Sequence, residues 1–352
     1  MTTPTAFRLF KQVPRILFGR GALDRLGELL PAQGWTACVV DAVHRDGPIP
    51  ARLAAHDVEV FWFDAAHEPS TDQVDAMTAL VRAARAEGPA AILGLGGGAA
   101  MDVAKGVSVM LTNPGSASDY QGWDLVPHPA VFKLGVPSLA GSGAEASRTA
   151  VFFSGDRKFG INSDHSMFDA ILLDPELLAG VPADQRFHSG MDCFIHCVEA
   201  VTGTMASPLA HAHAGKALEL CEAVFLGEGS DDDLMVASYM GGCSIVNSEV
   251  GVAHALSYGL SLELGLRHGL ANCIAFDALD AFYGAHVETF RRMMARHAIV
   301  LPRGVTRGMD RPAIARMVAM ALRMERPLVN ALGEDWRAVL TPERIEALYA
   351  RM

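Results

Sequence analysis

The sequence predicts two units, an N-terminal α/β unit with a parallel sheet and a C-terminal unit made of helices. Two observations support this prediction. In the first half, short apolar runs typical of buried strands alternate with amphipathic helical patterns, and such alternation indicates a parallel sheet covered on both faces. From about residue 185 onward, long helical patterns dominate. We place the boundary near residue 182, which divides the chain into 1–182 and 183–352.

The expected elements follow this division in order. Two segments with helical periodicity predict amphipathic helices at 21–30 and 72–88. Short apolar runs predict strands at 36–42, 58–65, 90–98 and 132–139. In the second half, helical patterns cover 207–225 and 232–264.

Composition limits the class of protein and its partners. The chain has 352 residues, of which 50% are hydrophobic, and a formal net charge of -11. This charge argues against nucleic acid or an anionic membrane as the main partner. The N-terminus lacks an apolar stretch of signal-peptide length, and no apolar run approaches the ~20 residues that span a bilayer. The six cysteines are scattered without disulfide spacing, so we expect a cytoplasmic protein with a small-molecule substrate.

A glycine-rich segment, "GLGGGAAMDVAKG" at 94–106, follows one expected strand and opens an expected helix. Gly96, Gly97 and Gly98 let a diphosphate approach the main chain, where backbone amides and the helix N-terminus attract anions. The string also fits G-x-G-x-x-A, a degenerate form of the dinucleotide fingerprint. These features predict a Rossmann-like dinucleotide-binding domain, although a tight turn without a ligand explains the segment as well.

Two other positions lie where strands are expected to end. A second polar turn, "VPSLAGSGAEASRTAVF" at 136–152, offers Ser138 and Ser142 to a phosphate or a nicotinamide amide. Asp41 ends the first expected strand, where its carboxylate could accept hydrogen bonds from an adenosine ribose. The alternative for Asp41 is a solvated loop acid.

The segment "GMDCFIHCVEAV" at 190–201 places ionisable groups in an apolar helix. Asp192, His196 and Glu199 are spaced i, i+4 and i+7, so they share one stripe. His254 and His268 lie fourteen residues apart in a second apolar region. One carboxylate with three imidazoles suits Fe²⁺ or Zn²⁺, and the alternative is a set of hydrogen-bonded core residues. Cys193 and Cys197 also have a spacing that suits zinc, but most buried cysteines act as small hydrophobes.

These motifs, together with "RHGLAN" at 267–272, resemble in their order the group III metal-dependent alcohol dehydrogenases, also called iron-containing alcohol dehydrogenases. The resemblance runs from "VPRILFGRGAL" near the start to at least residue 276. It implies the fold shared with dehydroquinate synthase, in which the active site lies between a dinucleotide-binding domain and a helical domain. It also implies an enzyme that oxidises a primary hydroxyl to an aldehyde by hydride transfer, and a homodimer.

Carried onto this sequence, the resemblance implies a set of site residues. The metal ligands are Asp192, His196, His254 and His268, and the cofactor-binding residues are Asp41, Gly97, Gly98, Ala99, Asp102, Ser138, Leu139, Ser142 and Lys158. Lys158 is expected to approach the cofactor ribose. Because an acid at position 41 disfavours a 2′-phosphate, NAD is favoured over NADP.

One position departs from the family pattern. Many relatives carry a histidine four residues after the third metal ligand, and here that position is Tyr258. A phenol can donate and accept a proton, but its ordinary pKa of about 10 makes it a poorer base at neutral pH. We expect Tyr258, together with Asp192 and His254, to take part in catalysis.

A narrower resemblance rests on "QGWDL", "GINSD" and "ALSYGLS". These strings are similar to family members that oxidise the C8 hydroxyl of 3-deoxy-D-manno-octulosonate (Kdo) for the 8-amino-Kdo of lipopolysaccharide, with dioxygen or a nicotinamide as electron acceptor. Arg148 and Arg267 are the candidate partners for an acidic substrate, and the alternative for each is a place on the surface without a ligand. The alternatives are a general NAD-dependent alcohol dehydrogenase or aldehyde reductase, and a dehydroquinate-synthase-like lyase. The lyase would need a basic phosphate pocket, and residues 250–270 hold no cluster of Lys and Arg.

Overall fold

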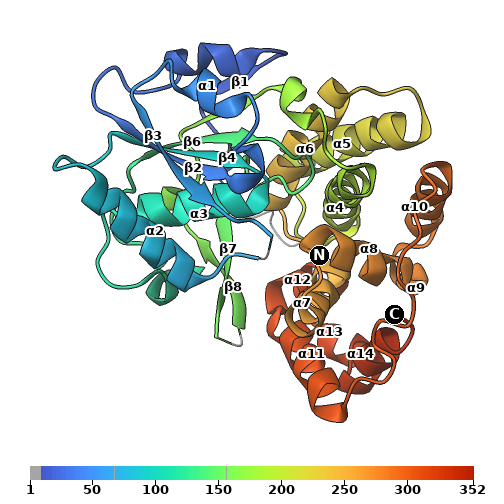
Figure 1. The fold of residues 1–352 in the computed structure, drawn as a ribbon. Helices are drawn as coiled ribbons and strands as arrows, with labels where there is room; N and C mark the ends of the chain where they lie inside the picture. The colour runs from blue at the N-terminus through green and yellow to red at the C-terminus, as the bar shows by residue number, and fades with distance from the viewer. Residues whose placement is uncertain (1–8, 67, 156) are drawn as a thin grey trace.

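A computed structural model describes residues 9–66, 68–155 and 157–352. It confirms a parallel-sheet unit followed by a helical unit, and the two lie side by side (Figure 1). The last strand of the main sheet ends at Leu173, and the first long helix begins at Ala183. The division into two domains near residue 182 stays a prediction.

The main sheet has six strands, and all of its pairings are parallel. Its order is β1 (Ile16–Phe18), β9 (Ala170–Leu173), β6 (Phe132–Pro137), β4 (Ala91–Gly96), β2 (Thr36–Asp41) and β3 (Val58–Phe63). The four strands expected from the sequence are β2, β3, β4 and β6. Because the strands are parallel, their carboxyl ends meet at one edge, which is where ligands bind in open α/β sheets.

Alternate residues of each central strand pack into separate cores. In β2, Ala37 and Val39 pack with α2 (Thr71–Ala84) and α3 (Gly98–Met110). Cys38 and Val40 point to the other face, which is covered by η1 (Ala22–Glu28) and α1 (Ile49–Leu53). The helix expected at 72–88 is therefore α2, and the segment expected as a helix at 21–30 forms the 3₁₀ helix η1.

A second sheet, which the sequence analysis did not predict, joins β5 (Gly122–Trp123), β8 (Arg157–Asn162) and β7 (Thr149–Ser154). β7 and β8 pair in antiparallel fashion, and β8 carries Lys158. The remaining 3₁₀ helices are η2 (Ala42–His44), η3 (Ala117–Tyr120), η4 (Asp164–Ser166) and η5 (Pro175–Leu178).

The C-terminal half consists of helices. They are α4 (Ala183–Thr202), α5 (Pro208–Leu226), α6 (Asp231–Val246), α7 (Val252–Leu264), α8 (His268–Asp277), α9 (Asp280–Tyr283), α10 (Ala285–Arg296), α11 (Arg311–Arg323), α12 (Glu325–Leu332), α13 (Trp336–Val339) and α14 (Pro342–Tyr349). Among the described residues, no helix combines the length and apolar character needed to cross a membrane.

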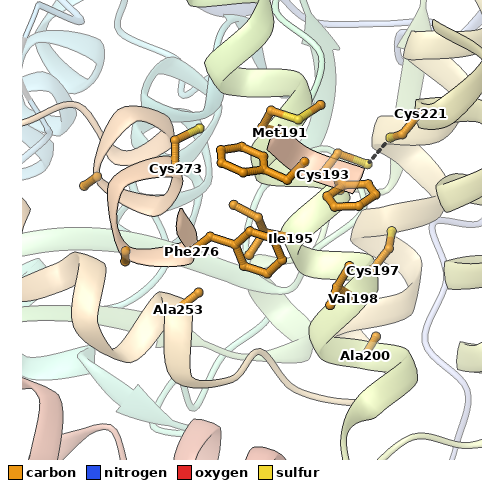
Figure 2. Packing of buried hydrophobic residues seen from close by; sticks show 14 of the residues in the cluster. Met191, Cys193, Ile195, Cys197, Val198, Ala200, Cys221, Ala253, Cys273 and Phe276 are labelled. Atoms are coloured by element: carbon orange, nitrogen blue, oxygen red, sulfur yellow. Dashed lines mark hydrogen bonds between the residues drawn. The ribbon is translucent and has the colours of Figure 1, made fainter. Parts of the chain in front are cut away.

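Helix α4 is enclosed by this half, and its apolar side chains between Phe187 and Ala200 are buried. Figure 2 shows Cys193, Ile195 and Val198 among the side chains of neighbouring helices. The Sγ of Cys193 donates to the carbonyl of Ala237 at 3.1 Å, and the Sγ of Cys221 lies 3.8 Å away. All six cysteines are buried free thiols, so Cys193 and Cys197 act as core residues, and the zinc alternative finds no support in their surroundings.

The two halves touch through backbone at Gly143, which belongs to the second polar turn. A Cβ at Gly143 would lie 2.5 Å from the Cα of Gly242 in α6, and the φ of Gly143 is +64°. Glycine at both positions thus permits the close packing of the turn against the helical half.

We predict that Gly143→Ala destabilises the protein more than Gly265→Ala does. Gly265 has the same φ of +64°, but no atom lies within 4 Å of the position that a Cβ would take there, so the left-handed backbone costs both variants roughly 1–2 kcal/mol. The backbone clash should add about 1–3 kcal/mol for Gly143→Ala alone. Chemical denaturation measures the free energy of unfolding of both variants. Equal losses of stability would contradict the close contact between Gly143 and Gly242.

Candidate functional site

Three helices deliver the polar side chains at the centre of the molecule. α4 carries Asp192 and His196, α7 carries His254, and α8 begins at His268. One nitrogen or oxygen atom from each of these four residues lies within 4.8 Å of the others. The structure therefore brings together all four residues that the sequence analysis selected as metal ligands, although they lie up to 76 positions apart, from 192 to 268.

The four side chains converge on one carboxylate oxygen. The Oδ1 of Asp192 lies 3.4 Å from the Nε2 of His254, 3.7 Å from the Nε2 of His268 and 3.8 Å from the Nε2 of His196. Asp192, His196 and His254 are buried, whereas the side chain of His268 is 26% exposed. The open side of the cluster is thus at His268.

Glu199 explains the third position of the polar stripe. Its Oε2 lies 2.5 Å from the Nδ1 of His254, and its Oε1 accepts from the backbone N–H of Ala253 at 2.7 Å and from the hydroxyl of Tyr283 at 2.9 Å. The carboxylate therefore lies outside the cluster and orients one of its imidazoles. Outer carboxylates of this kind fix the tautomer of histidines that bind metals. The sequence analysis placed Glu199 on the stripe but assigned it no role.

The orientation of His254 limits what lies between it and Asp192. Because its Nδ1 carries the proton shared with Glu199, its Nε2 presents a lone pair toward the Oδ1 of Asp192. Two acceptors facing each other at 3.4 Å repel unless a second proton or a cation lies between them. Without a cation, burial lowers the pKa of His254, but Glu199 and Asp192 outweigh burial and raise it to about 9.

The remaining titratable groups favour a cation over protons. Burial lowers the pKa of His196 and of His268 to about 4, so both imidazoles are neutral at pH 7 and offer lone pairs. Burial alone raises the pKa of the Asp192 carboxyl, but His196, His268 and His254 outweigh it and hold the pKa well below its usual range. One carboxylate with three imidazoles is a donor set that suits iron or zinc, so the residues present fit a divalent metal.

Asn272 is a neighbour of the cluster that the sequence analysis missed. Its Nδ2 lies 2.6 Å from the Oδ1 of Asp192 and 3.0 Å and 3.2 Å from the Nε2 atoms of His254 and His268. It stands one helical turn after His268, and that i+4 spacing was the available signal.

A cleft with a volume of about 2580 Å³ extends from this cluster to the carboxyl edge of the main sheet. Its size exceeds that of the usual small-molecule pocket. The cleft is lined by every cofactor residue and metal ligand expected from the sequence, and also by Tyr258. The cofactor residues among them are Asp41, Gly97, Gly98, Ala99, Asp102, Ser138, Leu139, Ser142 and Lys158.

The glycine-rich turn lies where β4 passes into α3. Gly97 precedes the helix, Gly98 is its first residue, and no side chain caps the N-terminus. A Cβ at Gly98 would come within 2.9 Å of the Oγ of Ser142. The first amides of α3 are therefore available to an anion, and the two polar turns meet around them.

Asp102 and Ser138 are held in place by residues of the N-terminal half. The Oδ2 of Asp102 accepts from the backbone N–H of Val151 at 3.0 Å, and burial raises its pKa to about 6. The Oγ of Ser138 lies 2.8 Å from the Nε2 of His44 in η2. Asp41 caps η2 by accepting from the backbone N–H of Val43 at 3.1 Å.

Lys158 and Tyr258 lie at the metal end of the cleft. The Nζ of Lys158 is 4.6 Å from the centre of the Tyr258 ring, and this ring stands edge-on to His268 with 5.8 Å between the ring centres. Burial raises the pKa of Tyr258 above its usual value, so the phenol keeps its proton at neutral pH and no phenolate is present to act as a base. A catalytic role for Tyr258 stays a prediction.

The two arginines considered for an acidic substrate differ in their surroundings. Arg148 lines the cleft and forms ion pairs with Asp124 and Asp164, so its charge is already compensated, and a role in binding an acidic substrate stays a prediction. Arg267 is exposed, lines the cleft and donates to the Oε1 of Gln185 at 3.1 Å.

Comparison with known proteins gives consistent results for both halves of the chain. Residues 14–175 match the family described as iron-containing alcohol dehydrogenase, and residues 186–327 match the C-terminal part of the same family. A sulfoacetaldehyde reductase from Bilophila wadsworthia is 30% identical over 342 residues, which covers 91% of this chain and 85% of that protein.

Solved structures share the fold. A 1,3-propanediol oxidoreductase has a TM-score of 0.80 and 24% identity, and the match covers 97% of this chain and 99% of the other. A sulfoacetaldehyde reductase from Bifidobacterium kashiwanohense, in complex with NAD⁺, has a TM-score of 0.82 and 20% identity over 97% of this chain and 98% of the other.

We predict that Asp192→Ala and His196→Ala each weaken zinc binding by at least about 100-fold, because each removes a donor from a four-donor set. Equilibrium dialysis against Zn²⁺ measures the affinity of each variant and of the wild type. His211→Ala is the matched control, since His211 is exposed on α5 and its loss should leave the affinity unchanged. Full zinc affinity in both test variants would rule out this cluster as the metal site.

Proposed function

This chain belongs to the iron-containing alcohol dehydrogenase family, and from that premise we propose that it interconverts small primary alcohols and aldehydes with NAD. The protein is an oxidoreductase, and its cofactors are those of the family, a divalent metal and a nicotinamide dinucleotide. The observation that carries the proposal is the convergence of Asp192 and three imidazoles at one end of a cleft whose other end is the glycine-rich turn.

In this proposal Asp192, His196, His254 and His268 hold the metal. When bound, the metal supplies Lewis-acid polarisation of the substrate oxygen and the nicotinamide supplies the hydride acceptor. The chain itself contributes the geometry. Glu199 keeps the Nδ1 proton of His254 in place, so that the Nε2 lone pair points into the cluster.

The walls of the cleft orient the cofactor in this proposal. Tyr258 stands edge-on to His268, at the side of the cluster that opens to the cleft. Gly97, Gly98 and Ala99 cradle the diphosphate in the proposal, Ser138, Leu139 and Ser142 line its path, and Asp41 meets the adenosine ribose. Because Asp41 stands at the carboxyl end of β2, where a 2′-phosphate would be repelled, we propose NAD rather than NADP.

The substrate class is the least constrained part. The relatives named above carry names for sulfoacetaldehyde and 1,3-propanediol, and neither name points to Kdo. We therefore favour the general alcohol dehydrogenase or aldehyde reductase over oxidation of Kdo at C8. A dehydroquinate-synthase-like lyase is disfavoured further, since Arg148 is already paired with two carboxylates.

We predict NADH-dependent reduction of sulfoacetaldehyde or 3-hydroxypropanal by protein loaded with Fe²⁺ or Zn²⁺, at least about tenfold faster than with NADPH. NADH absorbance measures the rate, and oxygen uptake is recorded in parallel with Kdo as a further substrate. Brisk oxidation of Kdo with no turnover of the simple compounds would replace this proposal by the narrower one. Absence of any turnover by protein that binds both zinc and NAD would contradict an oxidoreductase with this site.

We also propose a homodimer that forms through β1. This strand lies at the end of the sheet order, so one of its backbone edges has no partner strand among the described residues. Ile16 and Phe18 on this strand are 40% and 47% exposed, and an exposed apolar edge strand is a surface on which a second chain can pair.

The dimer makes a separate prediction. Sedimentation at micromolar concentration should give twice the mass of the 37.5 kDa chain, and Phe18→Lys should shift it toward the monomer because the charge would be buried in the interface. A monomeric wild-type protein, or a dimer that Phe18→Lys leaves intact, would contradict pairing at this edge.

A further inference from the structure

Lys158 is a buried cation next to a site for another cation. Its side chain is 2% exposed, and among the described residues its Nζ has no hydrogen-bond partner of good geometry. The Nζ lies over the rings of Tyr258 at 4.6 Å and Phe153 at 5.6 Å. A desolvated ammonium costs several kcal/mol unless a charge compensates it, and the nearest compensating group is Glu68, whose Oε2 is 3.0 Å away.

Glu68 comes from the loop between β3 and α2, in the nucleotide-binding half. Its carboxylate also interacts with the backbone N–H of His268, the first residue of α8. The N-cap residue Arg267 makes no side-chain cap to this helix, so the Glu68 carboxylate provides a negative charge near the first amide of α8, where such a charge stabilises a helix. The ion pair with Lys158 at 3.0 Å favours the charged form of Glu68.

The charges around His268 give this contact a consequence for the metal site. The Lys158 ammonium lies over the Tyr258 ring, and this ring stands edge-on to His268, so its positive charge disfavours a divalent cation at the same imidazole. The donor set itself contributes one negative charge, from Asp192. Glu68 adds a second negative charge that cancels Lys158, and it also fixes the backbone that carries His268.

We propose that Glu68 is a positioning residue for the metal centre. Glu68 neutralises Lys158 and holds the N-terminus of α8, so that His268 faces the other three donors. The inference rests on the proposed metal site. In this proposal, part of the metal affinity of the helical half comes from Glu68. This residue belongs to the nucleotide-binding half and is not one of the four donors.

The two contributions of Glu68 can be separated. Glu68→Gln keeps an oxygen that can accept from the backbone N–H of His268 but removes the charge, whereas Glu68→Ala removes both. Asp72→Asn is the matched control. It removes the same charge from an exposed side chain in the first turn of α2, four positions after Glu68. Lys158→Met removes the ammonium while keeping an unbranched apolar side chain near the Tyr258 ring.

The experiment measures the Zn²⁺ affinity of metal-free, NAD-free protein by competition with a chromophoric chelator. We expect Glu68→Gln to weaken binding about 10- to 100-fold, as outer partners of metal ligands typically do, and Glu68→Ala to weaken it further. Asp72→Asn should bind as the wild type does. Adding Lys158→Met to Glu68→Gln should restore most of the affinity, because no uncompensated ammonium remains.

Each outcome decides a part of the proposal. Wild-type affinity in Glu68→Gln and Glu68→Ala overturns it, and a double variant as weak as Glu68→Gln overturns the neutralisation of Lys158. If the Glu68 variants do not fold, Lys158→Met alone serves, because zinc should then bind more tightly than in the wild type, and weaker binding overturns the proposal. Failure of the metal site itself is distinguishable, since Asp192→Ala would then also retain wild-type affinity.

Discussion

The structure depends on keeping one carboxylate ionised in the interior. Asp192 is 3% exposed, and an isolated charge in that position would cost several kcal/mol. Three imidazoles and the amide of Asn272 surround its Oδ1. Those groups come from α4, α7 and α8, so the compensation of one charge requires three helices to be packed correctly. The apolar packing of α4 shown in Figure 2 holds this helix in place against its neighbours.

The second constraint is the common edge of the parallel sheet. β2, β4 and β6 end at the same side, and the residues that follow them are an acid, a glycine-rich turn and a serine-rich turn. The helical half closes over this edge through the contact of Gly143 with Gly242. A cleft results that has backbone amides at one end and the donor cluster at the other, and the ion pair of Glu68 and Lys158 lies at the metal end.

Much of this arrangement could be predicted from the sequence because local patterns carry it. The strands β2, β3, β4 and β6 and the helix α2 follow from apolar periodicity, and the glycine turn follows from the need for close backbone approach. The β7–β8 pair escaped prediction because the apolar run of β7 is short and overlaps the end of the polar turn at 136–152, and β8 begins with Arg157 and Lys158. The segment at 21–30 has the helical period but forms a 3₁₀ helix, whose first amides are held by Asp174 from a distant part of the chain.

The sequence by itself determined the fold class, the chemical character of the donors and the family, because each depends on residue type and local spacing. Only the tertiary structure decided that four donors from three helices meet, that Glu199 orients His254, that Arg148 is neutralised by two acids, and that Glu68 reaches across the cleft. Glu199 and His254 alone lie 55 positions apart, and local periodicity carries no information about the direction in which a distant side chain will point.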